Sequence, residues 1–415
     1  MNKIMLTTLW LATYPITNIY LSPISLFSWG DLLFMFLLCI NDNISGVKRF
    51  YYPSGYMLLW GYLAVTFFLS SLKYRGGSIS AMVPGGIAFF IFSLQLGYCS
   101  KKIDINLFYK YSRNLAVLAI IILCLQELSN YIIGKRFSAI IPFFNLTDGK
   151  TAKELISIQL NLDRSCSIFR EPAHIAQFLI IPLILDLFYI NKDRLVSKFT
   201  IFMIFAFLMA RSGNGLLALS LILSIKVLQY NRIHKGFKYK FFIVLILLVA
   251  SVAILYYVNT ENGSKILSRT SEFEKTESSK SYIRIYRGFD LFSNFSTKDK
   301  VIGINNADGV FEQTKKSNYY YLFSGEKEED LYFNCISRVL IFSGLIGFSL
   351  LMLISINLFK NNSILGRVLL FIFFVLSFVG QIYVTPLMLT VYVISTNYQY
   401  KNKKNENCIL HKTGV

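Results

Sequence analysis

Apolar segments recur along the whole chain and are separated by short polar turns and by two long polar stretches. Twelve segments predict membrane-spanning helices, at approximately 4–21, 24–40, 54–72, 79–98, 114–133, 173–190, 199–210, 215–229, 241–258, 333–359, 367–384 and 386–399. A helix needs about 20 residues to cross roughly 30 Å of hydrocarbon, whereas a membrane barrel shows alternating segments of about 10 residues. The pattern therefore predicts an all-α, polytopic membrane protein.

The seventh and eighth segments are short and flank the polar sequence Arg211-Ser-Gly-Asn-Gly215. They form either two separate helices or one broken helix. The loss of one crossing would reverse the sidedness of every later loop, so the number of crossings has to be decided from charge.

Basic residues in short loops hold those loops in the cytoplasm. With twelve crossings every even-numbered turn is basic and lies on the side of the C-terminal tail, while Lys73 and Arg75 are exceptions in a short outer turn. The basic residues of these turns and of the tail are Lys48, Arg49, Lys101, Lys102, Lys110, Arg113, Lys192, Arg194, Lys198, Arg232, Lys235, Lys238, Lys240, Lys360, Arg367, Lys401, Lys403 and Lys404. We therefore expect both termini to be cytoplasmic and the two long loops to face outward.

This topology divides the chain into alternating membrane and loop regions. We expect helices 1–5 in residues 1–133, a first large outer loop at 134–172, helices 6–9 in 173–258, a second large outer loop at 259–332, helices 10–12 in 333–399 and a cytoplasmic tail at 400–415. Lys3 begins an apolar stretch, but Pro15 interrupts it and no small-residue cleavage site is evident, so we interpret it as an uncleaved first helix.

Composition agrees with a membrane protein and excludes other classes. Of 415 residues, 54% are hydrophobic and 16% are charged, and the mean hydropathy is +0.51, which a water-exposed surface cannot accommodate. The formal charge of +19 lies in short turns and not in a basic patch, so we expect no nucleic-acid partner. The six cysteines show neither metal-ligand nor disulfide spacing, and we expect no metal and no cofactor.

The most specific local sequence is Arg164-Ser-Cys-Ser-Ile-Phe-Arg-Glu-Pro-Ala-His174, directly before an apolar helix. If that helix starts near Pro172, Arg170 and His174 rise from the same side of its first turn. Its free N–H groups and two guanidinium forks, from Arg164 and Arg170, would bind a diphosphate. Glu171 or His174 would accept a proton from a sugar hydroxyl. The competing interpretation is that the arginines reach the lipid headgroups and His174 is an ordinary interfacial histidine.

Further candidate ligands lie outside this sequence. Arg211 occupies the break between two apolar segments, where a charge is costly unless it is paired or hydrated. Arg284 and Arg287 are three residues apart and share a helical face in the second loop, where they would bind a second phosphate. Asn305 and Asn334 are candidate partners for sugar hydroxyls, although turn formation would explain Asn305 equally well.

Three local matches make the chain resemble the bacterial O-antigen polymerase and ligase superfamily. The sequence from Arg164 to Phe178 is similar to that family's Arg, aromatic, Glu-Pro pattern ahead of a span. Ala210-Arg-Ser-Gly213 is similar to its Ser-Arg-Ser/Thr-Gly turn, and Phe333-Asn334 with Gly344-Leu-Ile-Gly347 is similar to its His-Asn and Gly-x-x-Gly motifs. Ligases carry histidine at the position of Phe333, which favours a polymerase. The Arg-x10-Gly spacing of some polymerase loops is absent from both long loops.

The resemblance implies a glycosyltransferase that joins undecaprenyl-diphosphate-linked oligosaccharide repeat units at the periplasmic face of the inner membrane. Its arginines would neutralise the diphosphate while Glu171 or His174 deprotonates the acceptor. It also implies contact with membrane lipid and leaves open a chain-length regulator protein as a partner. Two alternatives remain, an O-antigen ligase and a lipid-linked oligosaccharide flippase or transporter. A transporter would favour buried charge, for which Glu127 and Asp186 are the main candidates.

Overall fold

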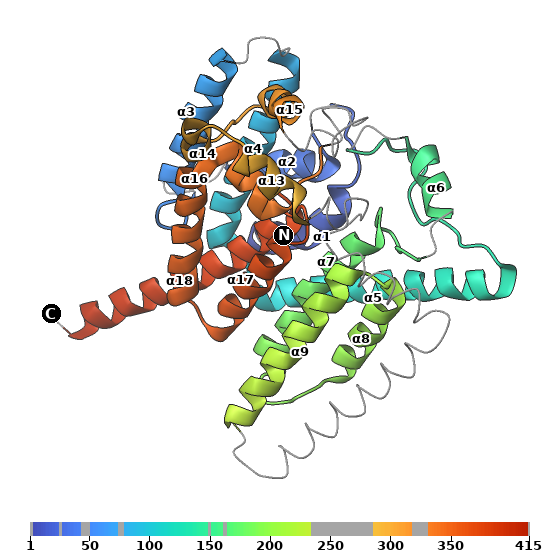
Figure 1. Ribbon diagram of the computed structural model, residues 1–415. Coiled ribbons are helices and arrows are strands. Elements are labelled where there is room, and N and C mark those ends of the chain that lie inside the picture. Colours follow the sequence, from blue (N-terminus) through green and yellow to red (C-terminus); the bar gives the residue numbers. More distant parts are fainter. Residues whose placement is uncertain are drawn as a thin grey trace.

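The computed structural model describes residues 3–24, 27–42, 50–73, 79–147, 151–160, 164–233, 285–317 and 331–413. These residues form 15 α-helices, one π-helical turn and two single β-bridges, so the described part of the protein is all-α as predicted (Figure 1). The helices are α1 (Lys3–Thr17), α2 (Trp29–Asp42), α3 (Tyr56–Lys73), α4 (Ile79–Lys102), α5 (Ile105–Ile133), α6 (Ala152–Leu160), α7 (Pro172–Leu185), η1 (Asp186–Ile190), α8 (Lys198–Ala210), α9 (Gly213–Ile233), α13 (Arg287–Ser293), α14 (Thr297–Ile302), α15 (Ala307–Lys316), α16 (Cys335–Lys360), α17 (Ile364–Ser377) and α18 (Pro386–Thr413).

Five helical segments are long and apolar enough to cross a membrane: α3, α5, α7 together with η1, α9 and α16. Shorter apolar helices are α2, α8 and α17. A multi-pass membrane protein follows from these segments. Every predicted segment coincides with a described helix except 241–258, which lies outside the described residues together with much of the second loop.

The break at Arg211 separates two helices. Arg211 ends α8 with a left-handed backbone (φ 48°), and α9 begins two residues later at Gly213. α8 and α9 then lie side by side and run in opposite directions (Figure 1). Of the two interpretations of this region, two separate helices is the one that the structure supports.

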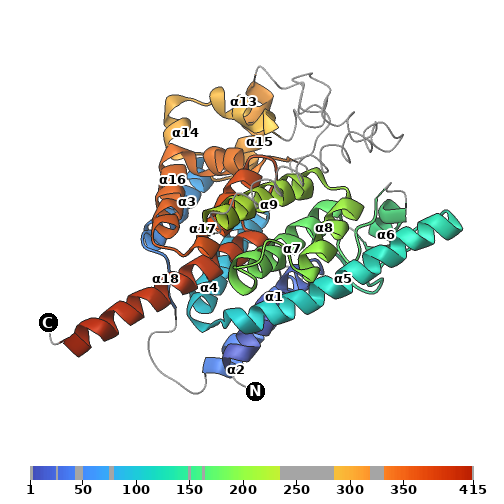
Figure 2. The same ribbon diagram turned by 90° about the horizontal axis from the view of Figure 1, so that it is seen from below.

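α7 lies at the centre of the described bundle. Apart from His174 and Gln177 near its start it is apolar, and it packs against α5, α8, α9, α17 and α18. A helix that is hydrophobic nearly all round is stable only when other elements surround it. Figure 2 shows α7 enclosed by its neighbours, whereas α5 and α18 both extend beyond the bundle. The first turn of α7 borders the cavity described in the next subsection.

The connections predicted to face outward contact one another. In the first long loop Asn145 O accepts a hydrogen bond from Leu21 N at 2.8 Å, beside the turn after α1. Lys73, at the end of α3, forms a 3.1 Å ion pair with Asp299 of the second loop. α6 and α13–α15 all lie in the upper half of Figure 1. The described parts of both long loops therefore lie toward the same end of the molecule.

The described part of the second loop is fixed to the bundle by close backbone packing. Gly303 (φ 86°) and Gly344 (φ 61°) touch, and Gly344 also kinks α16. Tyr62 donates its hydroxyl to Ile302 O at 2.7 Å and to Ser343 O at 3.0 Å. Glycine is required at such a crossing because it tolerates positive φ and lets two backbones approach.

Candidate functional site

One face of α7 lines a cavity of about 170 Å³. His174, Gln177 and Ile181 recur at intervals of three and four residues and therefore share that face. Pro172 occupies the first helical position, as predicted, because it needs no partner for a backbone N–H there. Arg170 lies two residues before the helix and is therefore not on its first turn, but its side chain borders the same cavity as His174.

The other walls of this cavity come from four parts of the chain. They are α1, the start of α5, the first long loop and the turn from α17 into α18. The lining residues from these parts are Leu11, Ala12, Pro15, Asn18, Ile19, Phe108, Ser112, Thr147, Gln381, Thr385, Pro386, Leu387 and Thr390. Asn18, Thr147 and Gln381 belong to connections at the same end of the molecule as the long loops, so the polar part of the cavity reaches that end. Its deeper part is mainly apolar, as in most ligand cavities.

Hydrogen bonds to α5 and α6 fix the backbone that carries Arg170. Gln159 of α6 donates to Phe169 O at 2.8 Å and to Arg170 O at 3.4 Å. Ser167, with a left-handed φ of 56°, donates its hydroxyl to Ala119 O at 2.6 Å and its N–H to Gln126 Oε1 at 2.7 Å. Because both ends of the Ser167–Arg170 segment are held, Arg170 enters the cavity from a fixed position.

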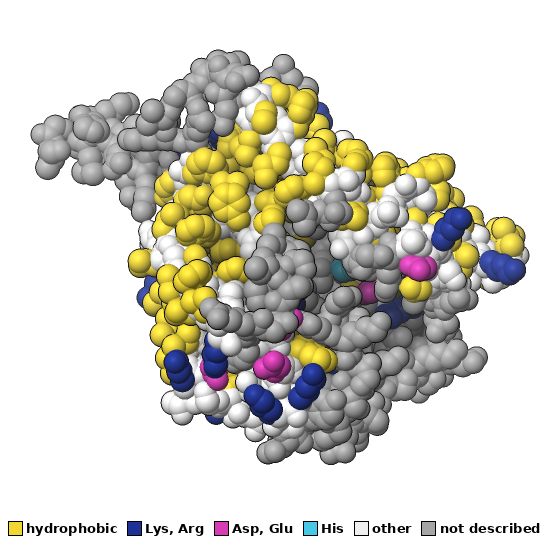
Figure 3. Space-filling view, turned by 90° about the horizontal axis from the view of Figure 1, so that it is seen from above, with side chains coloured by type: hydrophobic (Ala, Val, Ile, Leu, Met, Phe, Trp, Pro, Cys, Tyr) yellow, Lys and Arg dark blue, Asp and Glu magenta, His cyan; other side chains and the backbone are white. Residues whose placement is uncertain are grey.

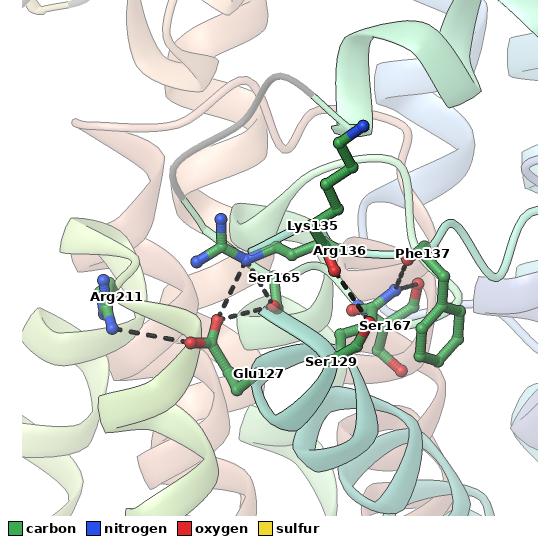
Figure 4. A network of polar contacts seen from close by, with 9 residues as sticks. Glu127, Ser129, Lys135, Arg136, Phe137, Ser165, Ser167 and Arg211 are labelled. Atoms are coloured by element: carbon green, nitrogen blue, oxygen red, sulfur yellow. Dashed lines mark hydrogen bonds and ion pairs between the residues drawn. The ribbon is translucent and has the colours of Figure 1, made fainter. Parts of the chain in front are cut away.

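A charged network lies beside this segment (Figure 4). Glu127 of α5 accepts a hydrogen bond from Ser165 at 2.6 Å and forms ion pairs with Arg136 at 3.5 Å and with Arg211 at 3.7 Å. Arg164 donates to the backbone carbonyl of Arg211 at 3.1 Å. Two arginines from separate segments therefore pair with one carboxylate, and a third, Arg164, is hydrogen-bonded to the backbone of one of them.

The two candidate bases occupy different environments. Glu171 is the exposed N-cap of α7 and makes no capping hydrogen bond with its side chain. His174 is partly buried and borders the cavity. Because His174 borders the cavity and Glu171 does not, a base inside the cavity is more easily supplied by His174.

The nearby Cys166 is buried, and burial, reinforced by the negative charge of Glu171, raises the pKa of its thiol to about 12.

The remaining predicted ligands lie elsewhere. Arg287 is fully buried, donates to Tyr332 O at 2.9 Å and lies 5.9 Å from the ring centre of Phe333. Asn334 is the N-cap of α16 and accepts a hydrogen bond from Ser337 N at 2.8 Å. Both residues connect the second loop to the start of α16. Arg284 lies outside the described residues.

Asn305 also has protein partners. Its amide donates to Leu63 O at 3.0 Å and to the Thr66 hydroxyl at 3.3 Å, and its backbone N–H donates to the Ser70 hydroxyl at 3.1 Å. These contacts fix the second loop to α3. Asn305 borders a second cavity, described below, and does not border the cavity of Arg170.

The buried carboxylate of Asp186 is saturated by hydrogen bonds at the opposite end of α7. Tyr109 donates to it at 2.6 Å, Asn191 at 2.9 Å and Thr200 at 2.8 Å, and Ser197 donates as well. These donors come from α5, from the end of η1 and from the start of α8. Asp186 thus ties helix ends together, as buried carboxylates do when all their lone pairs are used.

Sequence reasoning missed several cavity residues. Gln177 is one turn beyond His174, so helical spacing would have found it. Gln381 follows α17, and only tertiary folding places it opposite α7. Among the described residues, no group of three or more His, Cys, Asp or Glu side chains is arranged to hold a metal ion. Comparisons of the chain with protein-family models and with curated proteins give no match.

Proposed function

We propose that the protein is a membrane-embedded glycosyltransferase that polymerises undecaprenyl-diphosphate-linked oligosaccharide repeat units, as an O-antigen polymerase does. The observation that carries the proposal is the cavity at the start of α7, which Arg170, just before the helix, borders together with His174 and Gln177 of the helix itself. A cation, a proton acceptor and a neutral hydrogen-bonding group then face one space next to a network of three more arginines. This combination fits a diphosphate ester with a sugar attached.

The reaction transfers the growing chain from its undecaprenyl diphosphate to the terminal sugar of another lipid-linked unit. The bond between the anomeric carbon and the diphosphate oxygen breaks, and a bond from the acceptor hydroxyl oxygen to that carbon forms. The hydroxyl proton goes to the base, and undecaprenyl diphosphate leaves with the bonding electrons. The energy comes from the activated ester, so the reaction requires no nucleotide.

The residues take distinct roles in this proposal. Arg170 neutralises the charge that develops on the leaving diphosphate, which is the largest electrostatic demand of the transition state. Arg211, which pairs with Glu127, and Arg164, which donates to the backbone carbonyl of Arg211, add positive potential beside the cavity. His174 is the preferred base because it borders the cavity, and Glu171 is the alternative.

For the other predicted ligands we propose structural roles. Arg287, Asn305 and Asn334 hold the second loop against α3 and α16, as their protein contacts suggest. This loop would then cover the region in which the sugar chain lies. The saturation of Asp186 supports an enzyme over a transporter, because it leaves that carboxylate no free lone pair for a moving ion.

We further propose the bacterial inner membrane as the location, with twelve crossings, both termini cytoplasmic and the cavity opening to the periplasm. The basic short turns support this orientation. The contacts among the outer connections are consistent with it.

A deletion strain distinguishes this function from its alternatives. Silver-stained lipopolysaccharide from the strain should show core bearing a single repeat unit, because ligation continues without polymerisation. Bare core alone would indicate a ligase or a flippase. Complementation with the wild-type chain should restore the ladder, whereas Arg170→Ala at equal membrane abundance should not.

A further inference from the structure

A second cavity, of about 670 Å³, lies between α3, α4, α16 and the 305–308 segment. It is mainly apolar but contains one arginine and one aspartate, Arg338 and Asp308. It also borders the turn between α17 and α18. Tyr383 and Val384 of this turn face the second cavity, whereas Gln381 and Thr385 face the first. The two cavities are therefore neighbours across one short turn.

Arg338 is a charged group in the first turn of the candidate span α16. Its guanidinium lies 5.2 Å from the ring centre of Phe342. Among the described residues no carboxylate forms an ion pair with it, and no side chain or carbonyl accepts a hydrogen bond from its guanidinium. An arginine offers five N–H donors and remains charged even in apolar surroundings, so such a site favours an anionic ligand.

Asp308 adds a different requirement to the cavity. One of its carboxylate oxygens, Oδ2, is buried and accepts no hydrogen bond within the described part of the chain. A buried acceptor without a donor destabilises the site until a ligand supplies one. A ligand that fits both residues therefore carries an anionic group for Arg338 and a hydrogen-bond donor for Asp308.

The apolar wall of the cavity continues onto the outside of the bundle. Five of its aromatic side chains come from α3 and α4: Trp60, Phe67, Phe68, Phe89 and Phe90. Of these, Phe68 is 63% exposed and Phe90 is 48% exposed, although both line the cavity. In a candidate membrane protein such side chains face lipid. Figure 3 shows that hydrophobic side chains cover much of the described surface, with lysine and arginine gathered toward its edges. An alkyl chain can therefore extend from the cavity along these rings into the bilayer.

We propose that the second cavity binds a phosphate-bearing lipid whose head group donates hydrogen bonds. The phosphate binds Arg338, the head-group donor binds Asp308, and the hydrocarbon chain lies along the aromatic wall of α3 and α4. Two sources share this chemistry, a bilayer phospholipid with a primary ammonium and a prenyl-linked sugar phosphate. The site does not depend on the proposed function, because its residues are separate from those of the first cavity.

Native mass spectrometry of the full-length protein in detergent tests the site with three matched lipids. Dioleoyl phosphatidylethanolamine has phosphate and N–H donors, dioleoyl phosphatidylcholine has phosphate without N–H donors, and dioleoylglycerol has neither. We expect retention in that order. Arg338→Gln should reduce phosphatidylethanolamine retention about tenfold, because a charged hydrogen bond to the phosphate is lost. Asp308→Asn should reduce the preference for phosphatidylethanolamine over phosphatidylcholine.

A control variant and a second readout make the test independent of folding defects. Arg367→Gln removes an exposed arginine that donates to Phe359 O and Lys360 O, and it should leave retention unchanged. In the wild-type protein, phosphatidylethanolamine with a photoreactive chain should label residues 60–68 or 86–90. Labelling confined to other helices, equal retention of dioleoylglycerol, or undiminished retention by folded Arg338→Gln would overturn the proposal.

Competition then identifies the source of the lipid. A prenyl-diphosphate-linked monosaccharide that displaces phosphatidylethanolamine at equal concentration would make the cavity a second binding site for lipid-linked sugar. If the monosaccharide lipid fails to displace it, the occupant is a bilayer phospholipid. Both results support a phosphate site at Arg338.

Discussion

At the scale of single residues, Glu127 joins segments that are far apart in the sequence. It contacts Ser165, Arg136 and Arg211, and its side chain is only 18% exposed. We expect Glu127→Ala to destabilise the protein by roughly 1.5–3 kcal/mol, because the charged hydrogen bond from Ser165 and the two ion pairs are lost. Thermal unfolding in detergent measures the effect. Glu312→Ala, at an exposed site on α15, is the control and should change little. Equal melting temperatures for the two variants would show that the network does not stabilise the fold.

Cys166 provides a test of the environment just before α7. Its pKa of about 12 means that the reactive thiolate is scarce at neutral pH. In a variant that retains only this cysteine, we expect alkylation of the folded protein to be slow and to rise about tenfold per pH unit between pH 7 and 9. In the unfolded chain the rate should level off above about pH 8.5, the ordinary thiol value. Rapid alkylation of the folded protein at pH 7.5 would contradict the buried position.

Part of the candidate cavity lies within a segment that the sequence singles out. The segment from Arg164 to His174 was predicted as one cluster, and Arg170 and His174 of this segment line one cavity, whereas Arg164 contacts Arg211 beside it. Arg338 was missed because it lies inside an apolar segment and is conspicuous only once α3 and α4 enclose it. The burial of Arg287 could not be predicted from the sequence either, because its partner Tyr332 is 45 residues away.

At the scale of helices, the crossing of α14 and α16 depends on two glycines. A methyl group on Gly344 would collide with the carbonyl oxygen of Val301, and its φ of 61° disfavours any other residue. We expect Gly344→Ala to cost about 1–3 kcal/mol and to loosen α14 from the bundle. Limited proteolysis within 285–317 and thermal unfolding measure this change.

Gly61→Ala in α3 is the matched control. No atom lies within 4 Å of the added methyl group, so this variant should be neutral or more stable, as expected for glycine inside a helix. If both alanine variants resist protease equally, the glycine crossing is not what holds the second loop.

Helix boundaries were predicted less well than helix positions. The fifth span was predicted to begin at 114, but α5 begins at Ile105 because Asp104 caps it by accepting hydrogen bonds from Asn106 and Leu107. The eleventh was predicted to end at 384, whereas α17 ends at Ser377. Hydropathy marks the part of a helix that suits a membrane, whereas caps and turns determine where the helix ends.

At the scale of the whole molecule, the grouping of connections predicts which positions are accessible from one side. Lys153 of α6 and Lys315 of α15 are exposed in the two long loops, and Asp193 is exposed in the turn after η1. In intact cells we expect a membrane-impermeant maleimide to label cysteine at 153 and at 315 but not at 193. Labelling of 193 together with 153 would invalidate the topology, because the two residues would then lie on the same side of the membrane.

The claim that α7 carries the reaction site is tested most directly by the purified protein with undecaprenyl-diphosphate-linked repeat units. The rate of polymer formation should fall about 10- to 100-fold in Arg170→Ala, because a charged hydrogen bond to phosphate is lost. His174→Ala should be inactive while still binding substrate, and Arg367→Ala should match the wild type. Near-wild-type turnover in Arg170→Ala, and in both His174→Ala and Glu171→Gln, would remove this cavity from the mechanism.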